Sequence, residues 1–307
     1  MQSYKKILVG VDFNSHTGKL PVPTEVAIQK AIWLAKMVSG ELSFITVLDP
    51  SLEAGADDAD SPQSIVNNRL GELINDSAQS DMQISSKIVY GKGWYEITRE
   101  AIQSDSDLVI VGTREKTTAQ RMLYGSTAMK LIRSCPCAVF ITRPDVQPLD
   151  VETIVAADDF SPVGEKVLHA AVSTGQLIDA RLVVVHSVNY PLEGPMRRTE
   201  ASQEDLDAYK AKCRQDAEDE VNERLSMTDF RTLQQGTQVV IQGGPADSVV
   251  EEAVNEHQAG LLVMGTIARG GIPGYLIGNT AERLLPALNC SLLTLKPDDF
   301  VPPIKID

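Results

Sequence analysis

The 307-residue chain has few basic residues and no long apolar run. Lys and Arg number 28 against 42 Asp and Glu, which gives a net charge of −14. A surface this acidic repels phosphate backbones and anionic lipids, so we expect neither nucleic acid nor a membrane as a partner. No apolar run approaches the roughly 20 residues of a membrane-spanning helix, and the first residues lack the features of a secretion signal. A cytoplasmic protein is therefore expected.

Residues that carry chemistry are also scarce. The four cysteines do not suggest a disulfide framework in a chain of this length. Cys135 and Cys137 flank a proline, a spacing that suits a metal or redox pair, but no second cysteine pair or histidine pair accompanies them. We interpret them as buried structural thiols and expect no bound metal. The four histidines are scattered, and neither a P-loop nor a G-x-S-x-G motif occurs, so no catalytic residues are predicted.

What the chain does contain is an internal repeat of domain size. The segment KILVGVDFNS, which starts at residue 6, aligns without a gap with ETIVAADDFS, which starts at residue 152. The segment CAVFITRPD, from residue 137, aligns with CSLLTLKPD, from residue 290. The segment VIVGT, from residue 109, aligns with LVMGT, from residue 262. The segment Gly125-Ser126-Thr127 aligns with Gly278-Asn279-Thr280. The order of these segments is the same in both halves, which indicates a tandem duplication.

Within each half, apolar segments of strand length alternate with helical patterns. This alternation predicts an α/β protein with two tandem, doubly wound domains, each built on a five-stranded parallel sheet, over residues 1–146 and 147–307. We expect a helix between Thr24 and Gly40, loops at 49–63 and 189–201, and a charged, solvated helix at 202–226. The predicted strands are 6–12, 42–48, 83–90, 107–112, 138–143, 152–158, 181–188, 236–242, 260–265 and 291–296.

Ligands of open α/β sheets bind at the carboxyl ends of the strands. Those ends carry Asp12 and Asp158 after the first strand of each half, Val47 and Ser187 at the second, and Gly112 and Gly265 at the fourth. A loop then leads to a helix that starts near Gly125 or Gly278, where backbone N–H groups can hold an anion. Together these parts predict a nucleotide pocket. Asp158 and Asp159 could also hold a Mg²⁺ that accompanies ATP, although two such carboxylates commonly just face water.

This arrangement resembles the universal stress protein family in its tandem form, whose fold is of the adenine nucleotide alpha-hydrolase type. Nucleotide-binding members carry G-x-x-G, nine residues, and then G-S or G-T. The second half has Gly265 and Ala268 followed by nine residues and Gly278-Asn279, and the first has Gly112 and Glu115 followed by nine residues and Gly125-Ser126. Both copies thus replace the second glycine, the first copy with a carboxylate that would repel phosphates.

The resemblance also implies roles for individual residues. In the second half, Asp158 and Ser187 would flank adenine, Gly265 would face ribose, and Gly278, Asn279 and Thr280 would hold phosphates. Ala268, at the position of the second glycine, belongs to the same binding set. The counterparts in the first half are Asp12, Val47, Gly112, Gly125, Ser126 and Thr127. The family further implies that the last strands, 138–143 and 291–296, pair between the halves and make an internal pseudo-dimer. A homodimer of whole chains is a further candidate assembly.

Two functions remain open at this point. The first is a non-catalytic stress-response protein that binds ATP or another adenine nucleotide, with Mg²⁺, in the second half; slow hydrolysis of that ATP stays open. The second is a scaffold or small-molecule carrier that has lost nucleotide binding and uses the cleft for another ligand or a protein partner. Glu115 and Ala268 favour the second. An adenylating or hydrolytic enzyme is disfavoured because no catalytic set was found.

Overall fold

The computed structural model describes residues 4–14, 17–52, 61–77, 82–113, 124–144, 151–266 and 278–304. The chain is an α/β protein whose two halves contribute five strands each, as predicted. It divides into two compact units, an N-terminal and a C-terminal one, which are described separately. The predicted division between residues 146 and 147 lies outside the described residues. No described helix is long and apolar enough to cross a membrane.

The N-terminal unit is built on parallel strands in the order β3-β2-β1-β4-β5. Strand β1 lies between β2 and β4, so the chain leaves the sheet in opposite directions on its two sides, which is the switch point of a doubly wound fold. The elements are β1 (Lys6–Gly10), α1 (Val22–Val38), β2 (Glu41–Leu48), the 3₁₀ turn η1 (Pro50–Leu52), α2 (Pro62–Ser77), β3 (Ile84–Tyr90), α3 (Gly93–Gln103), β4 (Leu108–Gly112), α4 (Ser126–Ser134) and β5 (Ala138–Thr142).

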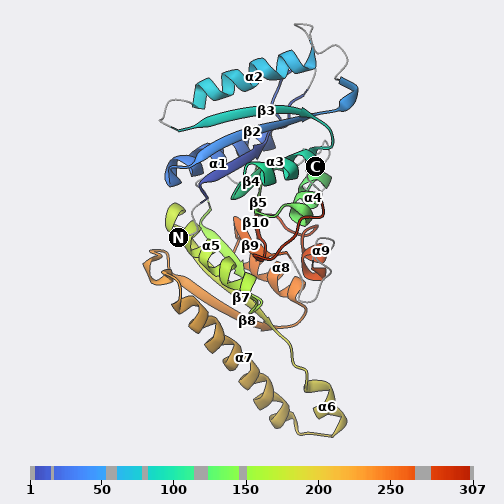
Figure 1. Ribbon diagram of the computed structural model, residues 1–307. Helices are drawn as coiled ribbons and strands as arrows, with labels where there is room; N and C mark the ends of the chain where they lie inside the picture. Colours follow the sequence, from blue (N-terminus) through green and yellow to red (C-terminus); the bar gives the residue numbers. More distant parts are fainter. Residues whose placement is uncertain are drawn as a thin grey trace. The chain divides into compact units, whose positions relative to one another are not determined.

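The C-terminal unit repeats this plan with four parallel strands in the order β9-β6-β7-β8. Helices α5 and α7 pack on one another and on the sheet, and α8 packs on α9. Figure 1 shows α6 and the first turns of α7 extending away from this sheet. The elements are β6 (Thr153–Ala157), α5 (Pro162–Ile178), β7 (Arg181–Val188), α6 (Glu193–Arg198), α7 (Gln203–Ser226), η2 (Phe230–Thr232), β8 (Thr237–Gly243), α8 (Ala246–Glu256), β9 (Leu261–Gly265) and α9 (Asn279–Leu284).

The last strand of the sequence, β10 (Ser291–Leu295), packs within the N-terminal unit. It pairs antiparallel with β5, and Leu292 lies opposite Ile141. This confirms the predicted pairing of the two last strands. Every residue of β10 is buried, so an apolar strand edge that β5 would otherwise expose is covered.

Buried lysines attach β10 to its neighbours. Lys30 of α1 is 4% exposed, and its Nζ lies 3.4 Å from Ser291 Oγ. Lys296, one residue beyond the strand, is 6% exposed, and its Nζ donates a hydrogen bond to the carbonyl oxygen of Ile132 in the last turn of α4. A cation at the carboxyl end of a helix is favoured by the helix dipole. Phe300 covers the Lys296 ammonium with its ring centroid at 4.6 Å.

Burial of Lys296 predicts how the stability of the protein changes with pH. Burial lowers its pKa from 10.5 to about 8, although Cys135 and Cys137 act in the opposite direction. Between these pH values the unfolded chain binds the proton and the folded chain does not, so this residue makes stability rise with pH, by up to about 3 kcal/mol. Denaturant unfolding from pH 7 to 10.5 should show that the free energy of unfolding of the parent increases relative to that of Lys296→Met as the pH rises. The exposed Lys36→Met is the control, and parallel profiles for the parent and Lys296→Met would contradict the prediction.

Two local predictions were wrong. Helix α1 begins at Val22 and not after Thr24, because Pro21 and Pro23 fix backbone angles that suit the helix start. The segment 189–201 was predicted to be a loop but contains α6. Glu193 in α6 forms ion pairs with Arg197 at 2.9 Å and with Lys210 of α7 at 2.8 Å.

Candidate functional site

The carboxylate of Asp158, at the end of β6, is closed off by an ion pair. Arg224 of α7 places its Nε 3.0 Å from Asp158 Oδ2 and its Nη2 3.3 Å from Oδ1. The backbone N–H of Phe160 donates a third contact to Oδ1 at 3.1 Å. The Asp158 side chain is 0% exposed and that of Arg224 is 8% exposed. A ligand therefore reaches this carboxylate only if Arg224 moves away.

Aromatic side chains complete the closure. The Phe160 ring stacks on His186 with centroids 3.7 Å apart, and the Arg224 guanidinium lies 5.8 Å from the centre of the Phe160 ring. His186 Nδ1 lies 2.8 Å from the carbonyl oxygen of Asp158. Burial raises the pKa of Asp158 above its ordinary value, and Arg224 offsets part of that rise. The protein's own side chains thus surround the Asp158 carboxylate, and the predicted contact of this residue with adenine remains a prediction.

Arg224 is the functional-site residue that the sequence reading missed. It lies in the helix that was predicted to be charged and solvated, and that helix is mostly exposed. However, Ala217, Val221, Arg224 and Leu225 are buried and recur at helical spacing. A short stripe of small and apolar residues among the charges was the available signal.

The corresponding positions of the N-terminal half are more open. Asp12 is exposed, in contrast to its counterpart Asp158. Val47 and its counterpart Ser187 are both half-buried, and the Ser187 hydroxyl donates to the carbonyl oxygen of Gly244 at 2.6 Å. The two halves therefore differ most at the end of their first strands.

Gly112 and Gly265, which were predicted to face ribose, have a packing role in the structure. A Cβ at Gly112 would lie 2.4 Å from the carbonyl oxygen of Pro23, in the first turn of α1. A Cβ at Gly265 would lie 2.9 Å from Cγ1 of Val163, in the first turn of α5. In both units the missing side chain lets a helix approach the end of a strand. The predicted contact with ribose remains a prediction.

The predicted phosphate-binding positions lie where a loop returns to the sheet. In the N-terminal half, Gly125 is the N-cap of α4, with φ −64° and ψ 162°, and it has no side chain with which to cap the helix. Ser126 and Thr127 are exposed. In the C-terminal half, the N–H of Gly278 donates to the carbonyl oxygen of Thr266 at 2.9 Å, which brings the start of α9 back to the end of β9.

The remaining members of the predicted set are less defined. Thr280 is half-buried in α9, and Asn279 is the first residue of that helix. Ala268 and Glu115 lie outside the described residues.

Two buried hydroxyls lie beside these loops at equivalent positions of the repeat. Thr113 follows Gly112 and is 7% exposed, and Thr266 follows Gly265 and is 1% exposed. Among the described residues neither hydroxyl has a hydrogen-bond partner. Buried polar groups in native proteins are usually paired with protein, water or a ligand.

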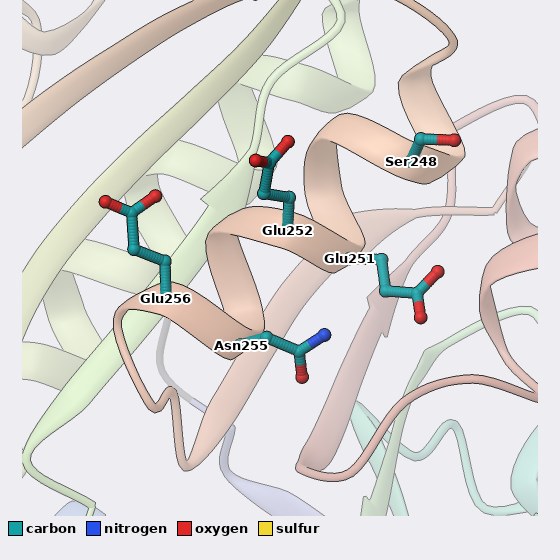
Figure 2. Close-up of a pocket in the computed structure, with 5 residues that line it drawn as sticks. All are labelled: Ser248, Glu251, Glu252, Asn255 and Glu256. Atoms are coloured by element: carbon teal, nitrogen blue, oxygen red, sulfur yellow. The ribbon is translucent and has the colours of Figure 1, made fainter.

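A shallow hollow elsewhere on the C-terminal unit does not resemble a phosphate site. Figure 2 shows that its lining residues all lie on α8 and that three of them are glutamates. Glu252 accepts a hydrogen bond from Gln242 at 2.6 Å. Across the described parts of the chain, no group of three or more His, Cys, Asp or Glu is arranged to hold a metal ion. We therefore keep the strand ends as the candidate site.

A duplicated, doubly wound fold in which a glycine ends each fourth strand and another glycine directly precedes the next helix is typical of tandem proteins of the universal stress class. The sequence profile of the universal stress protein family matches residues 3–143 and 151–296. The chain belongs to this family.

Individual relatives agree with this assignment over the whole chain. Universal stress protein E of Salmonella typhi is 24% identical, with 100% of this chain and 99% of that protein covered. Universal stress protein E of Escherichia coli K12 is 23% identical, with 100% and 98% covered. A crystal structure of a universal stress protein from Pseudomonas aeruginosa UCBPP-PA14 matches with a TM-score of 0.70 at 23% identity, over 97% of this chain and 95% of that one. The structural match supports the fold.

Proposed function

We propose that this universal stress protein acts without catalysis by binding an adenine nucleotide, ATP foremost, together with Mg²⁺. The observation that carries the proposal is the start of α4. Its N-cap residue, Gly125, has no side chain with which to cap the first N–H groups, and exposed Ser126 and Thr127 follow it. Such a helix start favours phosphate oxygens. The exposed Asp12 lies at the end of β1, which pairs with β4.

The two halves are unequal candidates. Their sequences favour the C-terminal loop, since Ala268 departs less from glycine than Glu115 does. The buried contact between Asp158 and Arg224 weighs against that half. Mg²⁺ bound with the nucleotide would offset the charge with which Glu115 would otherwise repel phosphates. We therefore propose that the nucleotide binds in the N-terminal half. The corresponding site of the C-terminal half is closed as long as Arg224 is paired with Asp158.

Calorimetry with Mg-ATP tests this proposal on a matched pair of variants. Gly125→Val is expected to weaken binding at least tenfold, because two methyl groups would enter the space in front of the first N–H groups of α4. The backbone angles at Gly125 suit valine, so the variant should fold, and circular dichroism checks this. Gly278→Val, at the equivalent position, is expected to bind as the parent does. ATP with EDTA should bind more weakly than Mg-ATP.

The other outcomes each give a definite answer. If only Gly278→Val loses binding, the site lies in the C-terminal half, as the sequence alone indicated. If the parent does not bind and no nucleotide is released from the denatured protein, the proposal is wrong. A scaffold or small-molecule carrier is then favoured, and the filled strand end around Asp158 is the observation that supports it. The pairing of β5 with β10 supports a pseudo-dimer within one chain under either function.

A further inference from the structure

The two cysteines on either side of Pro136 bring their sulfur atoms together. Cys135 follows the last residue of α4, and Cys137 immediately precedes β5. The distance between their Sγ atoms is 3.4 Å. A disulfide bond is about 2.0 Å long, so the sulfurs lie about 1.4 Å beyond bonding distance. The N–H of Cys135 donates to the carbonyl oxygen of Leu131 at 2.9 Å, which fixes one side of the pair to the helix.

The two thiols differ in their access to solvent. Cys135 is 0% exposed, whereas Cys137 is half-buried. A reagent from solution therefore meets Cys137 first, and Cys135 lies behind it in position to react second. The second half of the chain lacks this arrangement, because Leu288 occupies the position equivalent to Cys135 and leaves Cys290 without a neighbouring cysteine in the sequence.

A buried cation lies close to the pair. Thr294 of β10 pairs with Val139 of β5 in antiparallel register. Two residues after Thr294 is Lys296, and two residues before Val139 is Cys137, so the same register places these two residues opposite one another. A nearby ammonium stabilises a thiolate. In the reduced protein, the hydrogen bond with Cys135 and burial raise the pKa of Cys137 well above its ordinary value. Thiol–disulfide exchange at Cys137 is therefore expected to be slow. The quantity to measure is the equilibrium between the two thiols and the disulfide.

We propose that Cys135 and Cys137 are a redox couple that exchanges with a low-molecular-weight disulfide such as glutathione disulfide. The Cys137 thiolate attacks one sulfur of glutathione disulfide, which forms a mixed disulfide and releases one glutathione. The Cys135 thiolate then attacks Cys137 Sγ, which closes the protein disulfide and releases the second glutathione. The chain gives up two thiol protons and two electrons, and one glutathione disulfide becomes two glutathione thiols.

The couple lies at the joint where β10 docks on the N-terminal strands, since Lys296 contacts the last turn of α4 just before Cys135. The inference does not depend on nucleotide binding and applies equally to a carrier.

The test equilibrates the folded parent protein in glutathione buffers of increasing oxidised fraction at pH 8. Samples are quenched in acid and alkylated in denaturant, so that every free thiol reacts regardless of burial. At the oxidised end, Cys135 and Cys137 are both expected to be lost to alkylation, whereas the half-buried Cys213 can lose its thiol only as a mixed disulfide with glutathione. The peptide that contains Cys135 and Cys137 should be unalkylated and lighter by two hydrogen atoms. Cys135→Ala should instead carry one glutathione on Cys137, and Cys213→Ser should still form the internal disulfide.

Several results would overturn the proposal. Four alkylatable thiols at every buffer composition would show that the pair does not oxidise. A disulfide mapped to Cys213 or Cys290 would place the reaction elsewhere. Loss of the native circular dichroism signal along with thiol loss would show that oxidation occurs in the unfolded chain.

Discussion

Replacing Arg224 with methionine is expected to lower the free energy of unfolding of the C-terminal unit by about 3 to 5 kcal/mol. The substitution leaves the Asp158 carboxylate buried without its cation, since its side chain is 0% exposed. Urea unfolding followed by far-ultraviolet circular dichroism or hydrogen exchange measures the loss. Tryptophan fluorescence is unsuitable, because both tryptophans, Trp33 and Trp94, lie in the N-terminal half.

A double-mutant cycle separates the ion pair from ordinary packing. Asp158→Asn combined with Arg224→Met removes both charges, while the asparagine oxygen can still accept from the Phe160 N–H. The double variant should be more stable than Arg224→Met alone, because no unpaired charge remains buried. Arg214→Met, on an exposed position of the same helix, is the matched control and should cost less than about 1 kcal/mol. Additive losses in the cycle, or a small effect of Arg224→Met, would contradict this account.

Gly112→Ala is expected to destabilise the N-terminal unit by about 3 kcal/mol. The new Cβ would lie 2.4 Å from the carbonyl oxygen and 2.6 Å from the carbonyl carbon of Pro23. These are backbone atoms, so relief requires that α1 moves away from the sheet. Fluorescence of Trp33, which lies in α1, and of Trp94 during denaturant unfolding reports this loss.

Gly265, the equivalent glycine in the second half of the repeat, provides the control for this prediction. At Gly265 the added Cβ would meet the Val163 side chain at 2.9 Å, and a side chain yields more readily than a backbone. Gly265→Ala should therefore cost less than half as much as Gly112→Ala, measured by circular dichroism. Equal losses of stability in Gly112→Ala and Gly265→Ala would show that the contact of the new Cβ with the neighbouring helix does not determine the size of the loss.

The succession of elements could be read from the sequence because it depends on local patterns. Strand β4 is an unbroken apolar run, and its residues Leu108 to Val111 are buried, as expected for a strand covered on both faces. The start of α1 was misplaced because Thr24 looked like a cap, whereas the two prolines before and after Val22 set the boundary. Helix α6 was missed because its stability comes from contacts such as Glu193 with Lys210, which lie 17 residues apart.

The candidate site was less predictable because it depends on tertiary contacts. The sequence located Asp158 at a strand end, and the stripe in α7 could show that Arg224 is buried but not that it pairs with Asp158, 66 residues earlier. Gly112 and Gly265 were read as ligand contacts, because the sequence does not show which neighbour approaches a glycine. The proximity of the Cys135 and Cys137 sulfurs likewise depends on side-chain directions that spacing alone leaves undetermined.

The placement of β10 has a consequence for how this duplicated gene can evolve. The N-terminal copy relies on a strand encoded at the far end of the other copy, with Leu292 and Thr294 facing Ile141 and Val139. If the copies were separated into two genes, β5 would lose its partner β10. It would then be an exposed apolar edge strand, which is prone to self-association. The fusion is therefore hard to reverse, and the two copies can diverge in chemistry while the N-terminal copy still depends on the other for its last strand.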